Sequence, residues 1–97
     1  MMALTPEKRE ALNLARERIA AGQSRFICLA LDDVCTLFPY LGPACKQLRA
    51  YIRDQLRPWG TLGEWQVTNG CGDRSYPQQR RDRLAWIDWM LDEPKEA

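Results

Sequence analysis

The prolines of this chain restrict it to short helical segments, because a proline inside a helix lacks the amide hydrogen and its ring clashes with the preceding turn. Pro6 and Pro43 stand where a helix can begin, whereas Pro58 and Pro94 lie beyond points where one must already have ended. Between these points apolar residues recur at helical spacing. We therefore expect a mainly α, compact domain of three to four helices, with room for one short strand or a rudimentary hairpin.

Local signals mark the first and the last helix. Thr5 can cap a helix that has Pro6 in its first turn, and Gly22 is a natural stop for that helix. The last helix is expected to begin between residues 75 and 78 and to continue to about residue 92.

The second helix opens at Pro43 and must end before Pro58, so we expect its end by residue 57. All three helices belong to one domain, residues 1–97, because a chain of this length has no room for a second core. Residues 1–4 and 94–97 are expected to be frayed ends.

Two segments do not reveal their conformation. Residues 26–31 form an unbroken apolar run that suits either a buried strand or a short buried helix, and in both cases belongs to the core. We expect Asp32–Asp33 to end that run, and the chain up to residue 43 to be a loop with one helical turn at most. Later, Trp65–Val67 alternates like a strand and Asn69–Gly70 favours a tight turn, which indicates a rudimentary hairpin.

The composition excludes several functional classes. The chain has 14 basic and 13 acidic residues and a net charge of +1, so it is neither a polycation nor an acidic tail. It contains no histidine, and therefore lacks the commonest general base and the commonest metal ligand. Neither a glycine-rich phosphate loop nor a nucleophile elbow occurs, and Asp32–Asp33 is more typical of a turn or cap than of a magnesium site. We expect no enzyme, no cofactor and no metal site.

The sequence predicts a cytoplasmic protein with ordinary thiols. No apolar run approaches the ~18 residues that span a bilayer, and residues 1–10 lack the apolar region of a signal peptide. The cysteines are not arranged in the close pairs of a structural zinc site, and a reducing cytoplasm disfavours disulfides. A disulfide and a metal site are the less favoured alternatives for these residues: Cys28, Cys35, Cys45 and Cys71.

Basic residues follow one face of the second helix. At roughly 100° per residue, Lys46, Arg49, Arg53 and Arg57 share a face opposite the apolar one. Aligned cations on a rigid element can grip phosphates or an acidic protein, because their fields add. The alternative is a merely solvated helix face, in which Asp54 dilutes the charge.

The start of the last helix carries arginines where acids would suit the helix dipole. An external anion there would relieve the conflict, as would acids of the same chain such as Asp32, Asp33, Glu64 or Asp73. The candidate anion- or partner-binding residues of the whole chain are Arg49, Arg53, Arg57, Arg74, Arg80, Arg81 and Arg83.

The last helix is apolar around most of its circumference. Residues 84–91 leave only a narrow polar slot near Asp88, which is more apolar surface than a one-sided helix needs. Tryptophan is enriched at interface centres. We expect Trp86, Trp89 and Met90 to form an interface for self-association or for a docking partner, and the alternative is that they are ordinary core.

The residue patterns of four segments resemble those of a known group of sequences. The segments are ARERIA (15–20), FICLAL (26–31), QLRAYI (47–52) and RLAWID (83–88). Together they are similar to small uncharacterised accessory proteins encoded by tailed phages and prophages, over about residues 11–91. The resemblance implies a phage-borne protein made in the cytoplasm of a bacterial host, where such proteins bind and block a host or defence factor.

These features favour a small non-enzymatic binding or inhibitor protein whose arginines meet a protein partner with an anionic surface. An alternative is a nucleic-acid-binding module in which the same arginines contact phosphates and Trp59 or Trp65 stacks on bases. A weaker alternative is sequestration of a small anionic nucleotide between subunits. We expect no membrane partner.

Overall fold

The computed structural model describes residues 4–54, 58–59, 62–63, 68 and 75–92. Its elements, in chain order, are α1 (Pro6–Ala20), α2 (Ile27–Leu37), the 3-10 turn η1 (Pro39–Leu41), α3 (Gly42–Asp54), β1 (Pro58–Trp59), β2 (Leu62–Gly63) and α5 (Tyr76–Leu91). The expectation of a small, mainly α domain is confirmed.

Helix α1 begins and ends where the local signals place it. The hydroxyl of Thr5 accepts a hydrogen bond from the backbone N–H of Lys8 at 3.2 Å, and Pro6 occupies the first turn. Gly22 follows the helix with a φ of 74°, a left-handed conformation that costs glycine little. Leu4, expected to be frayed, packs against the core.

The apolar run at residues 26–31 is helical, because α2 begins at Ile27. The expectation that Asp32–Asp33 would end it is wrong, since α2 continues to Leu37. Both carboxylates are about half exposed and have cationic partners in other helices. Asp32 pairs with Arg49 of α3 at 2.5 Å, and Asp33 pairs with Arg18 of α1 at 3.3 Å.

The second of the expected helices, α3, follows η1 directly. The expectation of a loop up to residue 43 is wrong, because α2 continues to Leu37 and only Phe38 separates it from η1 and α3. The structure describes α3 up to Asp54, and residue 57 lies outside the described part of the chain. Next, β1 and β2 pair antiparallel, with Pro58 opposite Gly63 and Trp59 opposite Leu62. This two-residue pairing precedes the hairpin expected around residues 65–70, and those residues apart from Thr68 are not described.

Helix α5 begins with a capping box. The Ser75 hydroxyl accepts a hydrogen bond from the backbone N–H of Gln78, and the Gln78 side chain accepts one from the backbone N–H of Ser75 at 3.2 Å. This arrangement gives hydrogen-bond acceptors to two backbone N–H groups that have no partner within the helix. The start of α5 is therefore stabilised by two residues that are close together in the sequence, Ser75 and Gln78.

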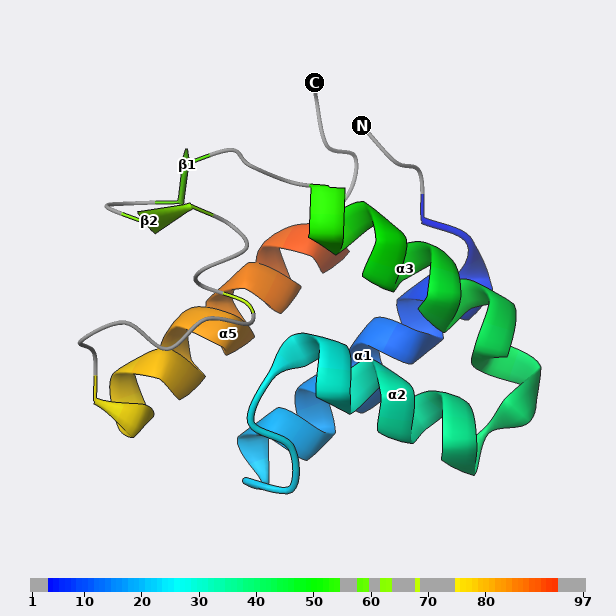
Figure 1. Ribbon diagram of the computed structural model, residues 1–97, viewed down its shortest axis with the longest axis horizontal. Coiled ribbons are helices and arrows are strands. Elements are labelled where there is room, and N and C mark those ends of the chain that lie inside the picture. Colours follow the sequence, from blue (N-terminus) through cyan, green and yellow to red (C-terminus); the bar gives the residue numbers. More distant parts are fainter. Residues whose placement is uncertain (1–3, 55–57, 60–61, 64–67, 69–74, 93–97) are drawn as a thin grey trace.

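The core is formed mainly around α1. In Figure 1, α5 lies along one side of α1 and α2 along the other, while α3 packs against α1 and α2. Residues from α1, α2, η1, α3 and α5 form one buried cluster, in which α1 supplies Ala11, Leu12, Ala15 and Ile19. A single core of this kind is what holds a domain of this length together.

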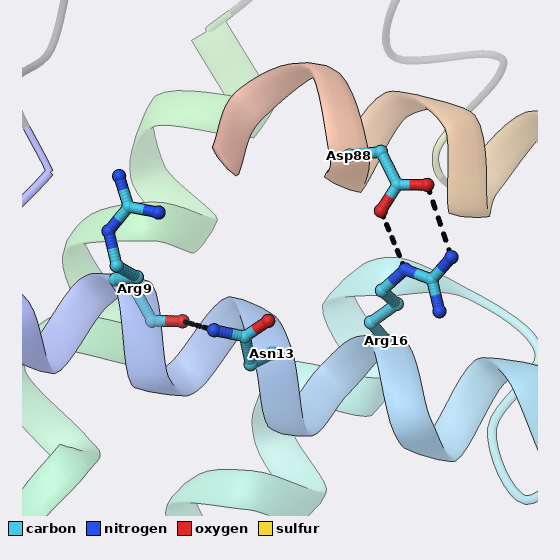
Figure 2. Close-up of polar contacts among 4 residues, drawn as sticks. All are labelled: Arg9, Asn13, Arg16 and Asp88. Carbon is cyan, nitrogen blue, oxygen red and sulfur yellow. Dashed lines mark hydrogen bonds and ion pairs between the residues drawn. The ribbon is translucent and has the colours of Figure 1, made fainter. Parts of the chain in front are cut away.

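Polar contacts also join α1 to α5. The guanidinium of Arg16 donates two hydrogen bonds to the carboxylate of Asp88, at 2.6 and 3.1 Å (Figure 2). Arg9 donates to the backbone carbonyl of Leu91 at 3.0 Å and so helps to satisfy the end of α5. Asp88, expected in a polar slot of the last helix, thus faces a cation of its own chain.

We expect the Arg16–Asp88 pair to stabilise the fold by less than about 1 kcal/mol, because the two side chains are 39% and 54% exposed. Arg16 holds the pKa of Asp88 below its ordinary value. The contribution of such a carboxyl is therefore present above the unfolded pKa of about 3.9 and is lost as pH falls through the lower folded pKa. Urea unfolding of the wild type and of Asp88→Asn should differ at pH 7 and converge well below pH 4. A difference that stays equally large at pH 2.5 would contradict this role.

Candidate anion-binding site

A basic hollow lies along α3. Its volume is about 360 Å³, and it is lined by Cys35 at the end of α2 and by Gly42, Cys45, Lys46, Arg49 and Arg53 of α3. The three cations come from successive turns of one helix, as the basic stripe in the sequence predicts. Lys46 and Arg53 are exposed and form no ion pair with any side chain that the structure describes.

Two other hollows differ from this one in their charge. A hollow of about 290 Å³ beside the start of α1 is lined by both Glu7 and Lys8, and one of about 190 Å³ beside its end is lined by both Glu17 and Arg18. Each therefore contains an acidic group beside its basic one. The hollow at α3 has cations and no acidic lining residue among those that the structure describes.

Arg49 is the anchored member of the basic group. Its Nη1 lies 2.5 Å from Oδ1 of Asp32 on the neighbouring helix. Its Nε is buried and makes no hydrogen bond within the described part of the chain. Because a guanidinium has five donors, the pair with Asp32 leaves Arg49 able to bind another acceptor.

Two thiols, those of Cys28 and Cys45, lie near Arg49. Burial raises the pKa of the Cys28 thiol, and the neighbouring Arg49 offsets part of that rise. Burial raises the pKa of the Cys45 thiol to about 11, with a further contribution from Cys35. Cys45 is therefore protonated at neutral pH and behaves as a small apolar residue. These three cysteines are free thiols, and Cys71 lies outside the described residues.

The arginines of α5 are placed quite differently from the expectation. Arg83 is only 1% exposed, and it donates hydrogen bonds to the carbonyl of Thr68 at 3.1 Å and to Oε1 of Gln79 at 3.3 Å. Its guanidinium also lies over the ring of Phe26, 4.9 Å from the centroid. The prediction that Arg83 meets an external anion is wrong, because protein atoms enclose it.

Other arginines near the start of α5 make cation–π contacts with aromatic rings. Arg80 lies 4.9 Å from the ring centroid of Tyr76, and Arg25 lies 5.4 Å from that of Tyr76 and 5.5 Å from that of Phe26. Cation–π contacts of this kind are favourable without any carboxylate. Asp32 and Asp33 form their ion pairs with Arg49 and Arg18 instead of with these arginines.

Of the described arginines on α5, Arg81 is the exposed one, and it forms no ion pair with the side chains in the described ranges. The aromatic contacts of Arg25, Phe26 and Tyr76 were not predicted from the sequence. Tyr76 and Arg80 are four residues apart and so adjacent on a helix, which is a signal that sequence reasoning could have used. Phe26 is distant in sequence and gives no such signal.

The expected interface on α5 also needs a correction. Trp86 is 0% exposed and Met90 is 1% exposed, and both belong to the core of the single chain. They therefore present no surface to a partner, since α5 packs them against α1. Trp89 is half-buried and packs against the same core, so its role in an interface stays a prediction.

Several expected site residues lie outside the described part of the chain. These are Arg57, Arg74 and Trp65, and nothing is described of the side chain of Trp59. Within the described ranges no group of three cysteines or acids is placed to hold a metal ion. None of the described helices combines the length and apolar character that crossing a bilayer requires.

Fold and site together define a small helical domain with a basic, thiol-lined hollow on its surface. The sequence matches no protein-family model, no curated protein and no solved structure.

Proposed function

We propose that this protein is a small non-enzymatic binding protein that recognises an acidic protein surface through Lys46, Arg49 and Arg53 of α3. The observation that carries the proposal is the charge of the hollow beside α3. It is lined by three cations, and Asp32 pairs with one of them. A cationic patch on a rigid helix steers an anionic partner and increases the rate of association.

The resemblance to accessory proteins of tailed phages adds a biological setting to the proposal. In that setting the protein acts as an inhibitor in the cytoplasm of a bacterial host, and its partner is a host or defence factor. A binder of this kind needs no catalytic group, which suits a chain without histidine. A nucleic-acid partner is the competing possibility, because its phosphates would bind the same cations.

The proposal predicts that reversing one charge of α3 weakens binding of a defined acidic probe. We expect the protein to bind a fluorescein-labelled glutamate-rich peptide, and Arg53→Glu to weaken that binding about tenfold, since it converts an attraction into a repulsion. Fluorescence anisotropy at 50 and 200 mM salt measures both. Arg81→Glu is the matched control, because it changes the net charge equally at an exposed arginine of another helix; we expect less than a twofold change.

The same measurement distinguishes the partner classes. An equal loss in both variants would contradict recognition by α3. Tighter binding of a single-stranded oligonucleotide than of the peptide, with a steep dependence on salt, would favour a nucleic-acid function instead.

A further inference from the structure

We propose that the hollow lined by Cys35 of α2 and by the basic face of α3 is a binding site for a phosphate monoester. Arg49, Arg53 and Lys46 hold the phosphate, and the carbon part of the ligand lies against Cys35, Cys45 and Gly42. This inference rests on the proposed function, because both use the basic face of α3. It goes further by naming the chemical group that the face recognises.

The charge around the hollow suits a doubly charged anion. Lys46, Arg49 and Arg53 line it, and Asp32 is the carboxylate that pairs with them. Among the described side chains this leaves about two positive charges unmatched. A phosphate monoester carries about −1.5 to −2 at neutral pH, whereas a carboxylate carries one negative charge and would leave the site half matched.

The donors at the hollow suit the oxygens of a phosphate. Arginine is well adapted to phosphate because its planar fork gives two parallel hydrogen bonds. Arg49 is held in place by Asp32, and because a guanidinium has five donors, this pair leaves others for a ligand. Arg53 and Lys46 also line the hollow, and both are exposed, so a ligand can reach them from solvent.

The remaining lining residues favour a ligand that also has an uncharged part. Cys45 lines the hollow and its thiol is protonated at neutral pH, so it adds no negative charge there. Cys35 lies close to the start of α3, because a β-carbon at Gly42 would be 3.5 Å from its Sγ. A volume of about 360 Å³ lies at the small end of the range for ligand pockets and suits one small organic group.

The first test compares two small probes that have the same ring. Phenyl phosphate and benzoate differ in the anionic group, so the proposal predicts that phenyl phosphate raises the Tm more than benzoate at equal ionic strength. At ten times its Kd we expect phenyl phosphate to raise the Tm of the wild type by about 5 °C or more. Arg53→Gln should lose most of this rise, and Arg81→Gln should keep it, because Arg81 lies on α5.

A second test locates the ligand in the hollow. Bound phenyl phosphate should slow the alkylation of Cys35 by iodoacetamide at least several-fold, as followed by mass spectrometry of the Cys35 peptide. In Arg53→Gln the same concentration should leave the alkylation rate unchanged. This readout does not depend on how strongly binding stabilises the fold.

The phosphate monoester can come from a free metabolite or from a phosphoserine of a protein partner. Phenyl phosphate represents the first source, and a phosphoserine peptide with its unphosphorylated form as a control represents the second. Binding of either phosphorylated probe that requires Arg53 supports the site, and the tighter of the two identifies the source.

The proposal is overturned if neither phosphorylated probe binds, if benzoate stabilises the protein as much as phenyl phosphate, or if Arg53→Gln responds like the wild type. These results leave the proposed function separately testable. A glutamate-rich peptide that still binds through Arg53 would show that α3 recognises acidic protein surfaces but not phosphate monoesters.

Discussion

Replacing Trp86 by alanine is expected to lower the free energy of unfolding by about 3–5 kcal/mol. The indole is completely buried, and it is one of the largest side chains in the core that α5 shares with α1. Its removal takes away apolar contacts and leaves a cavity that packed helices cannot close. Because a small domain has a total stability of about 5–15 kcal/mol, a large part of it would be lost.

Urea unfolding followed by far-UV circular dichroism measures this effect without relying on the fluorescence of the residue removed. Trp89→Ala is the matched control, because Trp89 is on the same helix but half-buried, and we expect a loss of about 1–2 kcal/mol. If Trp86→Ala retained its stability but changed its mass in light scattering, the indole would belong to an interface between chains instead.

Replacing Arg83 by alanine is expected to lower the free energy of unfolding by about 2–4 kcal/mol. The side chain is buried and satisfies the carbonyl of Thr68 and the amide oxygen of Gln79. Truncation leaves these two acceptors without that donor and removes the contact with Phe26. Arg83→Lys should rescue little, since an ammonium group is a point donor and lacks the planar fork that reaches both acceptors.

Arg81→Ala provides a close control for Arg83→Ala, because it removes the same side chain from an exposed position two residues earlier in α5. We expect it to change the stability by no more than about 0.5 kcal/mol. Equal effects of the two substitutions would show that the arginines of α5 act through general charge rather than through buried contacts.

Helix ends were predictable because their causes are local. Thr5, Pro6 and Gly22 predict the limits of the first helix, and α1 has those limits with Thr5 as its cap. The start of the last helix was expected between residues 75 and 78, and the capping box at Ser75 lies at one end of that range. In each case the hydrogen bond joins residues three apart, so the sequence alone contains the signal.

The course of α2 was not predictable, because it depends on other helices. The two neighbouring acids of residues 32–33 resemble a turn when seen alone, since aspartate competes with the helix for backbone hydrogen bonds. In the structure their carboxylates pair with Arg49 and Arg18 from α3 and α1. No local pattern contains these contacts, and so the sequence favoured a stop where the helix continues.

The basic stripe of the second helix was predicted, but the pocket beside it was not. The spacing of Lys46, Arg49 and Arg53 follows from helical periodicity, whereas Cys35 reaches the same hollow from another helix. Arg83 was misplaced because arginine is seldom buried. Its position three residues before Trp86 and four before Ile87 places it on the buried side of α5, and that spacing could have corrected the interpretation.

The attachment of α5 to α1 has a consequence for how the chain assembles. Arg16 and Asp88 are 72 positions apart, while α1, α2, η1 and α3 follow one another along the chain. Closing so long a loop costs entropy before any contact compensates for it, so docking of the last helix is the non-local step of folding. During synthesis on the ribosome, the side of α1 that packs against α5 therefore stays open until α5 has emerged, and a chaperone can bind there in that interval.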